Sequence, residues 1–120
     1  MAPYPLDRVR AICLALPEAT EKREGVMVGF LVRSKTFAWF TDDHHGDGRI
    51  ALSCKATFED QDILVTADPV RFFVPPYVAR YGWIGVRLDR DPDWDELGNL
   101  VAQSYRLIAP KRLVARLVAG

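Results

Sequence analysis

The sequence lacks the features that mark several specialised classes of protein. Its two cysteines, Cys13 and Cys54, are too few for a disulfide framework. Sixteen basic residues balance sixteen acidic ones, which is unlike a domain dominated by phosphate binding. No apolar run approaches the roughly 20 residues of a membrane-spanning helix, and the N-terminal segment has no basic region followed by an apolar core. These absences lead us to expect a cytoplasmic protein.

Motifs that would identify an enzyme are also missing. Gly46 and Gly48 do not open a helix after a strand, so no dinucleotide or phosphate-loop signature is present. Cys54 shares the apolar phase of its segment, which predicts a buried, unreactive thiol. The acids within residues 89–96 lack the glycine of a calcium loop and are better explained as helix caps. We therefore expect no catalytic activity and no cofactor.

The one cluster of metal-ligand side chains lies in the loop of residues 42–48. His44 and His45 are adjacent there, among three aspartates. Neighbouring histidines on a glycine-rich turn point apart, and no second cluster has zinc-like spacing. The pattern indicates a solvated turn and no metal site.

The length and the apolar content fit one ordinary globular domain spanning residues 1–120. The chain has 120 residues, of which 49% are hydrophobic. Apolar spacing and capping residues predict helices over residues 6–16, 58–67, 92–109 and 110–117. Asp91 and Pro92 are expected to start the third helix. Thr57 is expected to cap the second helix, from which Phe58, Ile63 and Leu64 are available to face a core.

Alternating apolar residues predict the strands. A hairpin is expected over residues 29–42, with Arg33, Ser34 and Lys35 at its tip. Further strands are expected over residues 49–55, 70–74 and 83–88, whereas the charged segment 18–25 is expected to be a loop. Because the central connections are too short for crossovers, the sheet should be largely antiparallel.

The expected fold is α+β, with an antiparallel sheet and helices on one face, in the order α-β-β-β-α-β-β-α. The second face would carry polar and aromatic side chains and would be partly solvated: Arg49, Lys55, Trp83 and Arg87.

Several segments together resemble the MmcQ/YjbR family: residues 16–21 (LPEATE), 30–32 (FLV), 35–39 (KTFAW), 82–84 (GWI) and 104–108 (SYRLI). The resemblance implies a two-layer fold similar to secretion-chaperone-like and frataxin-like arrangements. Members are often described as predicted DNA-binding proteins on the basis of a proposed double-wing arrangement, and no catalytic residues come with the family. Residues 25–29 depart from the pattern, because they lack the tryptophan and histidine often seen before the first strand.

Two functions remain open. The first is nucleic-acid (DNA) binding, because cations beside aromatic side chains suit phosphate contact and base stacking. Its candidate residues are Arg33, Lys35, Arg49, Lys55, Arg80, Trp83 and Arg87. Zero net charge weakens that hypothesis, although residues 97–120 contain four cations and no acid. The second is a protein-interaction or chaperone-like module, with an exposed sheet face or edge that binds a partner or forms a homodimer.

Overall fold

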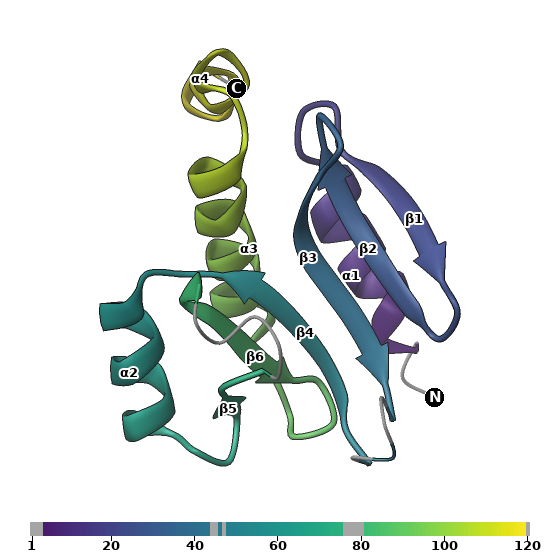
Figure 1. Ribbon diagram of the computed structural model, residues 1–120, viewed down its shortest axis with the longest axis vertical. Helices are drawn as coiled ribbons and strands as arrows, with labels where there is room; N and C mark the ends of the chain where they lie inside the picture. The colour runs from purple at the N-terminus through teal and green to yellow at the C-terminus, as the bar shows by residue number, and fades with distance from the viewer. Residues whose placement is uncertain (1–3, 44–45, 47, 76–80, 120) are drawn as a thin grey trace.

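The computed structural model describes residues 4–43, 46, 48–75 and 81–119. These residues form a six-stranded antiparallel sheet and four helices (Figure 1). The elements are α1 (Pro5–Leu14), β1 (Thr20–Glu24), β2 (Met27–Val32), β3 (Lys35–Asp42), β4 (Ile50–Lys55), α2 (Phe58–Ala67), β5 (Phe72–Phe73), β6 (Trp83–Arg87), α3 (Trp94–Ile108) and α4 (Lys111–Ala119). The α+β prediction is therefore confirmed.

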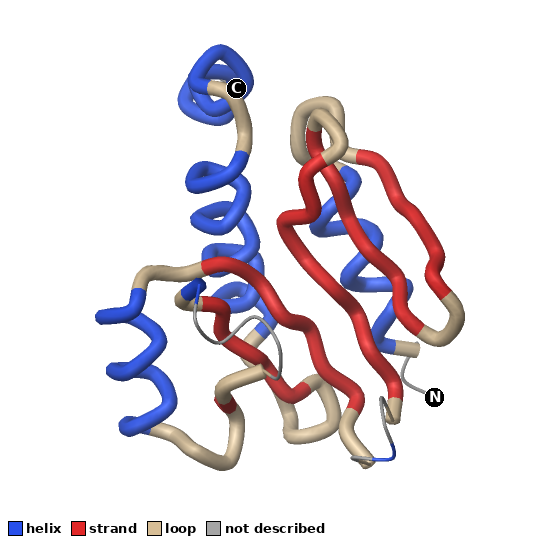
Figure 2. The backbone as a smooth tube through the Cα atoms, in the orientation of Figure 1, coloured by secondary structure: helices blue, strands red, loops and turns tan. Residues whose placement is uncertain are grey.

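The sheet has the order β1-β2-β3-β4-β6-β5, and every neighbouring pair is antiparallel. Helices α1 and α3 pack against the central strands. In Figure 2 both helices lie behind the strands, so the opposite face of the sheet is turned toward the viewer. Helix α2 lies beside the sheet and packs against β5 and β6.

The core lies between the sheet and helices α1 and α3. One row of paired residues crosses four strands, from Phe30 to Ala38, Cys54 and Ile84, and all four side chains are fully buried. Burial raises the pKa of the Cys54 thiol to about 12, because a thiolate is poorly solvated in an apolar interior. The prediction of a buried thiol is confirmed.

The β2–β3 hairpin has a two-residue turn made by Arg33 and Ser34. Both residues have positive φ values, of 50° and 67°. This is the backbone geometry of the turn whose twist matches that of the flanking strands. The predicted hairpin is confirmed, and Lys35 is the first residue of β3 rather than part of the turn.

The prediction of a loop over residues 18–25 is wrong, because residues 20–24 form the edge strand β1. All five side chains are exposed, so neither face gives the apolar alternation by which a strand is recognised from sequence. Backbone pairing with β2 holds this strand in place. Its charged side chains suit an edge that must not pair with another sheet.

Two helix predictions also need correction. Helix α3 begins at Trp94, and its N-cap is Asp93, whose carboxylate accepts a hydrogen bond from the Glu96 amide at 3.0 Å. Asp91 has a φ of 51°, which is unlike the extended backbone of an N-cap. In α2, Thr57 caps the helix as predicted, but Phe58 and Ile63 are 60% and 54% exposed and do not face the core.

Ser104 joins β3 and β4 at the point where the two strands stop pairing. Their last paired residues are Ala38 and Cys54. Beyond them, the buried Ser104 hydroxyl donates to the carbonyl of Phe37 at 2.7 Å and accepts from the amide of Lys55 at 2.9 Å. One side chain of α3 thus satisfies both backbone groups that the diverging strands leave unpaired.

Within the described ranges, none of the helices combines the length and the apolarity that crossing a bilayer requires.

Candidate nucleic-acid interface

The candidate residues for nucleic-acid binding that the structure describes do not share one surface. Lys35 is the first residue of β3, whereas Arg49 lies beside the last, since the Asp43 amide donates to the Arg49 carbonyl at 2.7 Å. A strand of eight residues separates these ends by about 23 Å. Arg80 lies outside the described residues.

The candidates on the second face of the sheet are engaged in contacts within the protein. The Arg49 guanidinium lies over the ring of Phe73, 4.3 Å from its centroid. Arg87 makes two hydrogen bonds to the carboxylate of Asp89, both of 3.0 Å. Arg87 is therefore already paired with an acid, and the Arg49 guanidinium is held against an aromatic ring.

Trp83 does not provide a stacking surface, because it is only 7% exposed. It pairs with Lys55 in the sheet, and the Gln61 side chain of α2 donates to its carbonyl at 2.7 Å. The alternation of apolar residues along the strand predicted that this tryptophan lies on a partly solvated face of the sheet. Helix α2 packs against β6, and this tertiary contact cannot be predicted from the alternation of residues along the strand.

The hairpin tip is different, because the structure brings further cations to it. Arg33 and Lys35 line one side of a cavity of about 340 Å³, and the junction between α3 and α4 lines the other. Lys111, the first residue of α4, contributes a third cation there. In Figure 1 α4 faces the β2–β3 hairpin at the top of the molecule.

Two more cations of α4 lie near the same place, as the electrostatics of Glu18 indicate. The Arg33 guanidinium donates two hydrogen bonds to the Glu18 carboxylate, of 2.7 and 3.1 Å. These bonds lower the pKa of Glu18, and the charges of Arg116 and Arg112 lower it further. We call the set Arg33, Lys35, Lys111, Arg112 and Arg116 the basic end.

The local folding of α4 explains why its cations are accessible. Leu113 is 2% exposed and belongs to the core, so this residue fixes the inner side of the helix. Lys111, Arg112 and Arg116 are all exposed. The helix therefore presents its charges outward, as expected of an amphipathic helix with one buried stripe.

A hydrogen bond from α3 positions the loop that carries Glu18. The Tyr105 hydroxyl of α3 donates to the carbonyl of Pro17 at 2.6 Å, and the Tyr105 ring packs edge-on against Phe37. Tyr105 is fully buried. The Ser104 and Tyr105 hydroxyls of α3 are thus both hydrogen-bonded to backbone groups far away in the sequence.

The α4 cations were absent from the predicted site, although the sequence held a signal for them. Residues 97–120 contain no acid, and the segment was recognised as locally basic. Nothing in the local pattern placed it beside Arg33 and Lys35. No group of three or more metal-ligating side chains occurs in the part of the chain that the structure describes, and His44 and His45 lie outside that part.

Comparison with known proteins identifies similar sequences and folds. A family model described as YjbR matches residues 14–107. The crystal structure of Deinococcus radiodurans protein DR2400, which contains the domain DUF419, is similar with a TM-score of 0.71 and 27% sequence identity. The similarity covers 86% of this chain and 77% of that chain. No curated protein matches. Since the family match ends at residue 107, the cations of α4 lie beyond it.

Proposed function

This chain belongs to the YjbR family, and we propose that it binds nucleic acid through the basic end formed by the β2–β3 hairpin and α4. The observation that carries the proposal is the convergence of Arg33, Lys35 and Lys111 on one cavity of about 340 Å³. Two segments that are far apart in the sequence supply these charges to a single surface. Exposed cations gathered in this way suit the phosphate backbone.

The cations have different roles in this proposal. Arg33 is held by Glu18 at the hairpin turn, so it fixes the wall of the cavity. Lys35 and Lys111 are exposed and make no ion pair among the described residues. Their flexible ammonium groups act as point charges that contact phosphate oxygens.

The proposal predicts binding without strong base preference. Trp83 is buried, so the stacking platform that the sequence suggested is not part of the interface. Phosphate contacts carry no sequence information directly. We expect duplexes of different sequence to bind with similar affinity, and the affinity to fall steeply with salt.

The experiment is a fluorescence-anisotropy titration of labelled duplex and single-stranded DNA over a series of salt concentrations. The test variant is Lys35→Glu combined with Lys111→Glu. Each lost phosphate contact should make the slope of the logarithm of the association constant against the logarithm of the salt concentration less negative by about one. Wild-type protein that shows no binding at low salt overturns the proposal.

Arg90→Glu provides a matched control for the charge change. Arg90 is exposed and lies in the connection between β6 and α3. The 15 residues of α3, about 22 Å of helix, separate that connection from α4. Arg90→Glu should leave the salt slope unchanged, and an effect equal to that of Lys111→Glu alone would contradict a localised site.

A further inference from the structure

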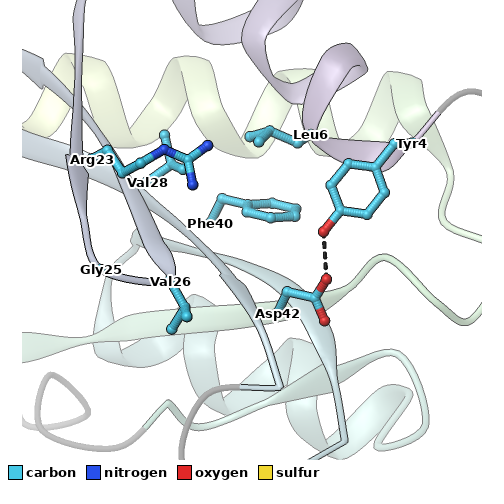
Figure 3. A pocket seen from close by; sticks show the side chains of 8 residues that line it. All are labelled: Tyr4, Leu6, Arg23, Gly25, Val26, Val28, Phe40 and Asp42. Carbon is cyan, nitrogen blue, oxygen red and sulfur yellow. Dashed lines mark hydrogen bonds between the residues drawn. The ribbon is translucent and has the colours of Figure 1, made fainter.

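A second cavity lies at the opposite end of β3 from the basic end. It has a volume of about 290 Å³ and forms where the start of α1, the turn between β1 and β2, and the last residue of β3 meet (Figure 3). This volume is close to the lower limit of cavities that bind small molecules. The site is therefore large enough for a compact organic ligand.

The floor of this N-terminal pocket is apolar and its rim carries exposed apolar side chains. Leu6, Val28 and Phe40 line the floor and are 6%, 1% and 2% exposed. Tyr4 and Val26 stand at the rim and are 45% and 62% exposed. A ligand with an apolar body would remove part of this rim from water, which is favourable in proportion to the area covered.

The polar groups of one wall of the pocket are hydrogen-bonded to each other. The Tyr4 hydroxyl donates a hydrogen bond to the Asp42 carboxylate (Figure 3). Burial and this hydrogen bond raise the pKa of Tyr4 to about 12. The Tyr4 ring also packs edge-on against Phe40, with 5.9 Å between the ring centroids. Tyr4 and Asp42 therefore form a fixed wall.

The other polar wall carries a cation. Figure 3 shows the Arg23 guanidinium beside Val28 and on the side of the pocket away from Tyr4. No acidic side chain of the described residues forms an ion pair with Arg23, whereas the nearby Glu21 is paired with Arg10 at 2.8 Å. A guanidinium presents several N–H donors in a planar array that matches a carboxylate.

The backbone adds positive potential at the same place. Helix α1 begins at Pro5, and Tyr4 gives it no side-chain cap. Pro5 has no N–H and the Asp7 amide donates to the Tyr4 carbonyl at 2.9 Å, so the helix dipole, rather than a row of free amides, favours a negative charge nearby. The start of α1 and Arg23 thus act in the same direction, although Asp7 in the first turn offsets part of the helix contribution.

We propose that the N-terminal pocket binds a small carboxylate with an apolar or aromatic body. The carboxylate pairs with Arg23, and the body covers Phe40 and Val28 between the rim residues Tyr4 and Val26. Arg23 forms no ion pair with an acid of the described residues, whereas the Asp42 carboxylate already accepts the Tyr4 hydrogen bond; a ligand amine would bind on the Asp42 side of the pocket, away from Arg23. The site is separate from the basic end.

The test uses phenylacetate, with its neutral analogue phenylacetamide and its cationic analogue phenethylamine as matched probes. Each is titrated into ¹⁵N-labelled protein and followed by two-dimensional amide NMR. Phenylacetate should produce saturable shifts of the Arg23, Val26 and Asp42 amides. Phenylacetamide should bind about tenfold more weakly or worse, because it lacks the charge-assisted hydrogen bonds.

Arg23→Gln is the test variant and Lys22→Gln is its control. The two positions are adjacent in β1, but Arg23 pairs with Val28, which lines the pocket, and Lys22 pairs with Gly29 on the opposite face. Arg23→Gln should weaken phenylacetate binding about tenfold, and Lys22→Gln should not change it. Equal affinity of phenylacetate for wild type and Arg23→Gln overturns the proposal, as does the absence of saturable shifts in the wild type.

Discussion

At the scale of single residues, Ser104 shows how one hydroxyl holds two strands together. It satisfies the Phe37 carbonyl and the Lys55 amide where β3 and β4 diverge. Both strands carry candidate cations, Lys35 and Lys55. The position of the hairpin relative to the rest of the sheet therefore depends in part on a buried side chain of α3.

Ser104→Ala should lower the free energy of unfolding by about 1–3 kcal/mol, because it leaves two buried backbone groups without partners. Urea denaturation monitored by tryptophan fluorescence measures the change. Gln103→Ala is the control, since Gln103 is the preceding residue of the same helix and is exposed. Similar stabilities for the two variants would show that the Ser104 hydrogen bonds contribute nothing.

A second residue-scale prediction concerns alkaline pH. Burial raises the pKa of Cys54 from 9.0 to about 12. Between these values the unfolded chain loses the thiol proton and the folded chain keeps it. Because the unfolded state then binds fewer protons, the free energy of unfolding must fall as the pH rises above 9.0.

Urea denaturation on either side of pH 9.0 checks this linkage. Each such thiol contributes a slope of at most about 1.4 kcal/mol per pH unit. Cys54→Ala removes the titrating group and should show a shallower decline than the wild type. The same decline in both proteins would mean that Cys54 does not titrate differently in the folded and unfolded states.

At the scale of elements, two glycines with different surroundings should respond in opposite ways to replacement by alanine. A Cβ added to Gly98 in α3 would meet no atom within 4 Å. Gly98→Ala should raise the free energy of unfolding by about 0.5–1 kcal/mol, because alanine loses less backbone entropy in a helix. A Cβ added to Gly85 in β6 would lie 2.4 Å from the Phe73 ring, so Gly85→Ala should lower stability by about 1–3 kcal/mol.

Thermal unfolding of the two variants tests this pair together. The same chemical change should move the midpoint in opposite directions. A gain at Gly85 would mean that the Phe73 ring moves aside at no cost. A loss at Gly98 would mean that α3 packs more tightly at this point than the 4 Å clearance indicates.

The elements also differ in how far the sequence predicted them. The β2–β3 hairpin and the cap of α2 at Thr57 follow from residues close together in the chain, and both are confirmed. Strand β1 was missed because its side chains are exposed on both faces. The start of α3 was misplaced because Asp91 and Asp93 both precede a helical pattern, and only the backbone φ of 51° at Asp91 rules it out as the cap.

At the scale of the whole molecule, the formal net charge is zero while five cations gather at the basic end. Local potential, rather than total charge, determines where an anionic polymer binds. Glu18 is the acid held within this cluster by Arg33. Its carboxylate opposes the potential that the proposed function requires.

Glu18→Gln should therefore strengthen DNA binding, since it removes one negative charge from the basic end. Glu59→Gln makes the same change of total charge on an exposed residue in the first turn of α2 and should have a much smaller effect. Anisotropy titrations at one fixed salt concentration compare the two. Equal gains would indicate that only total charge matters and would contradict a localised interface.

The antiparallel α+β fold, the family and the buried thiol could all be predicted from the linear chain. These depend on local periodicity, short connections and residue order, all of which are present in the linear chain. The burial of Trp83, the position of α4 opposite the hairpin, and the pocket shared by Tyr4, Arg23 and Asp42 became known from the three-dimensional structure alone. Contacts between distant segments leave no periodic signature, because they depend on how whole elements pack and not on the spacing of residues within them.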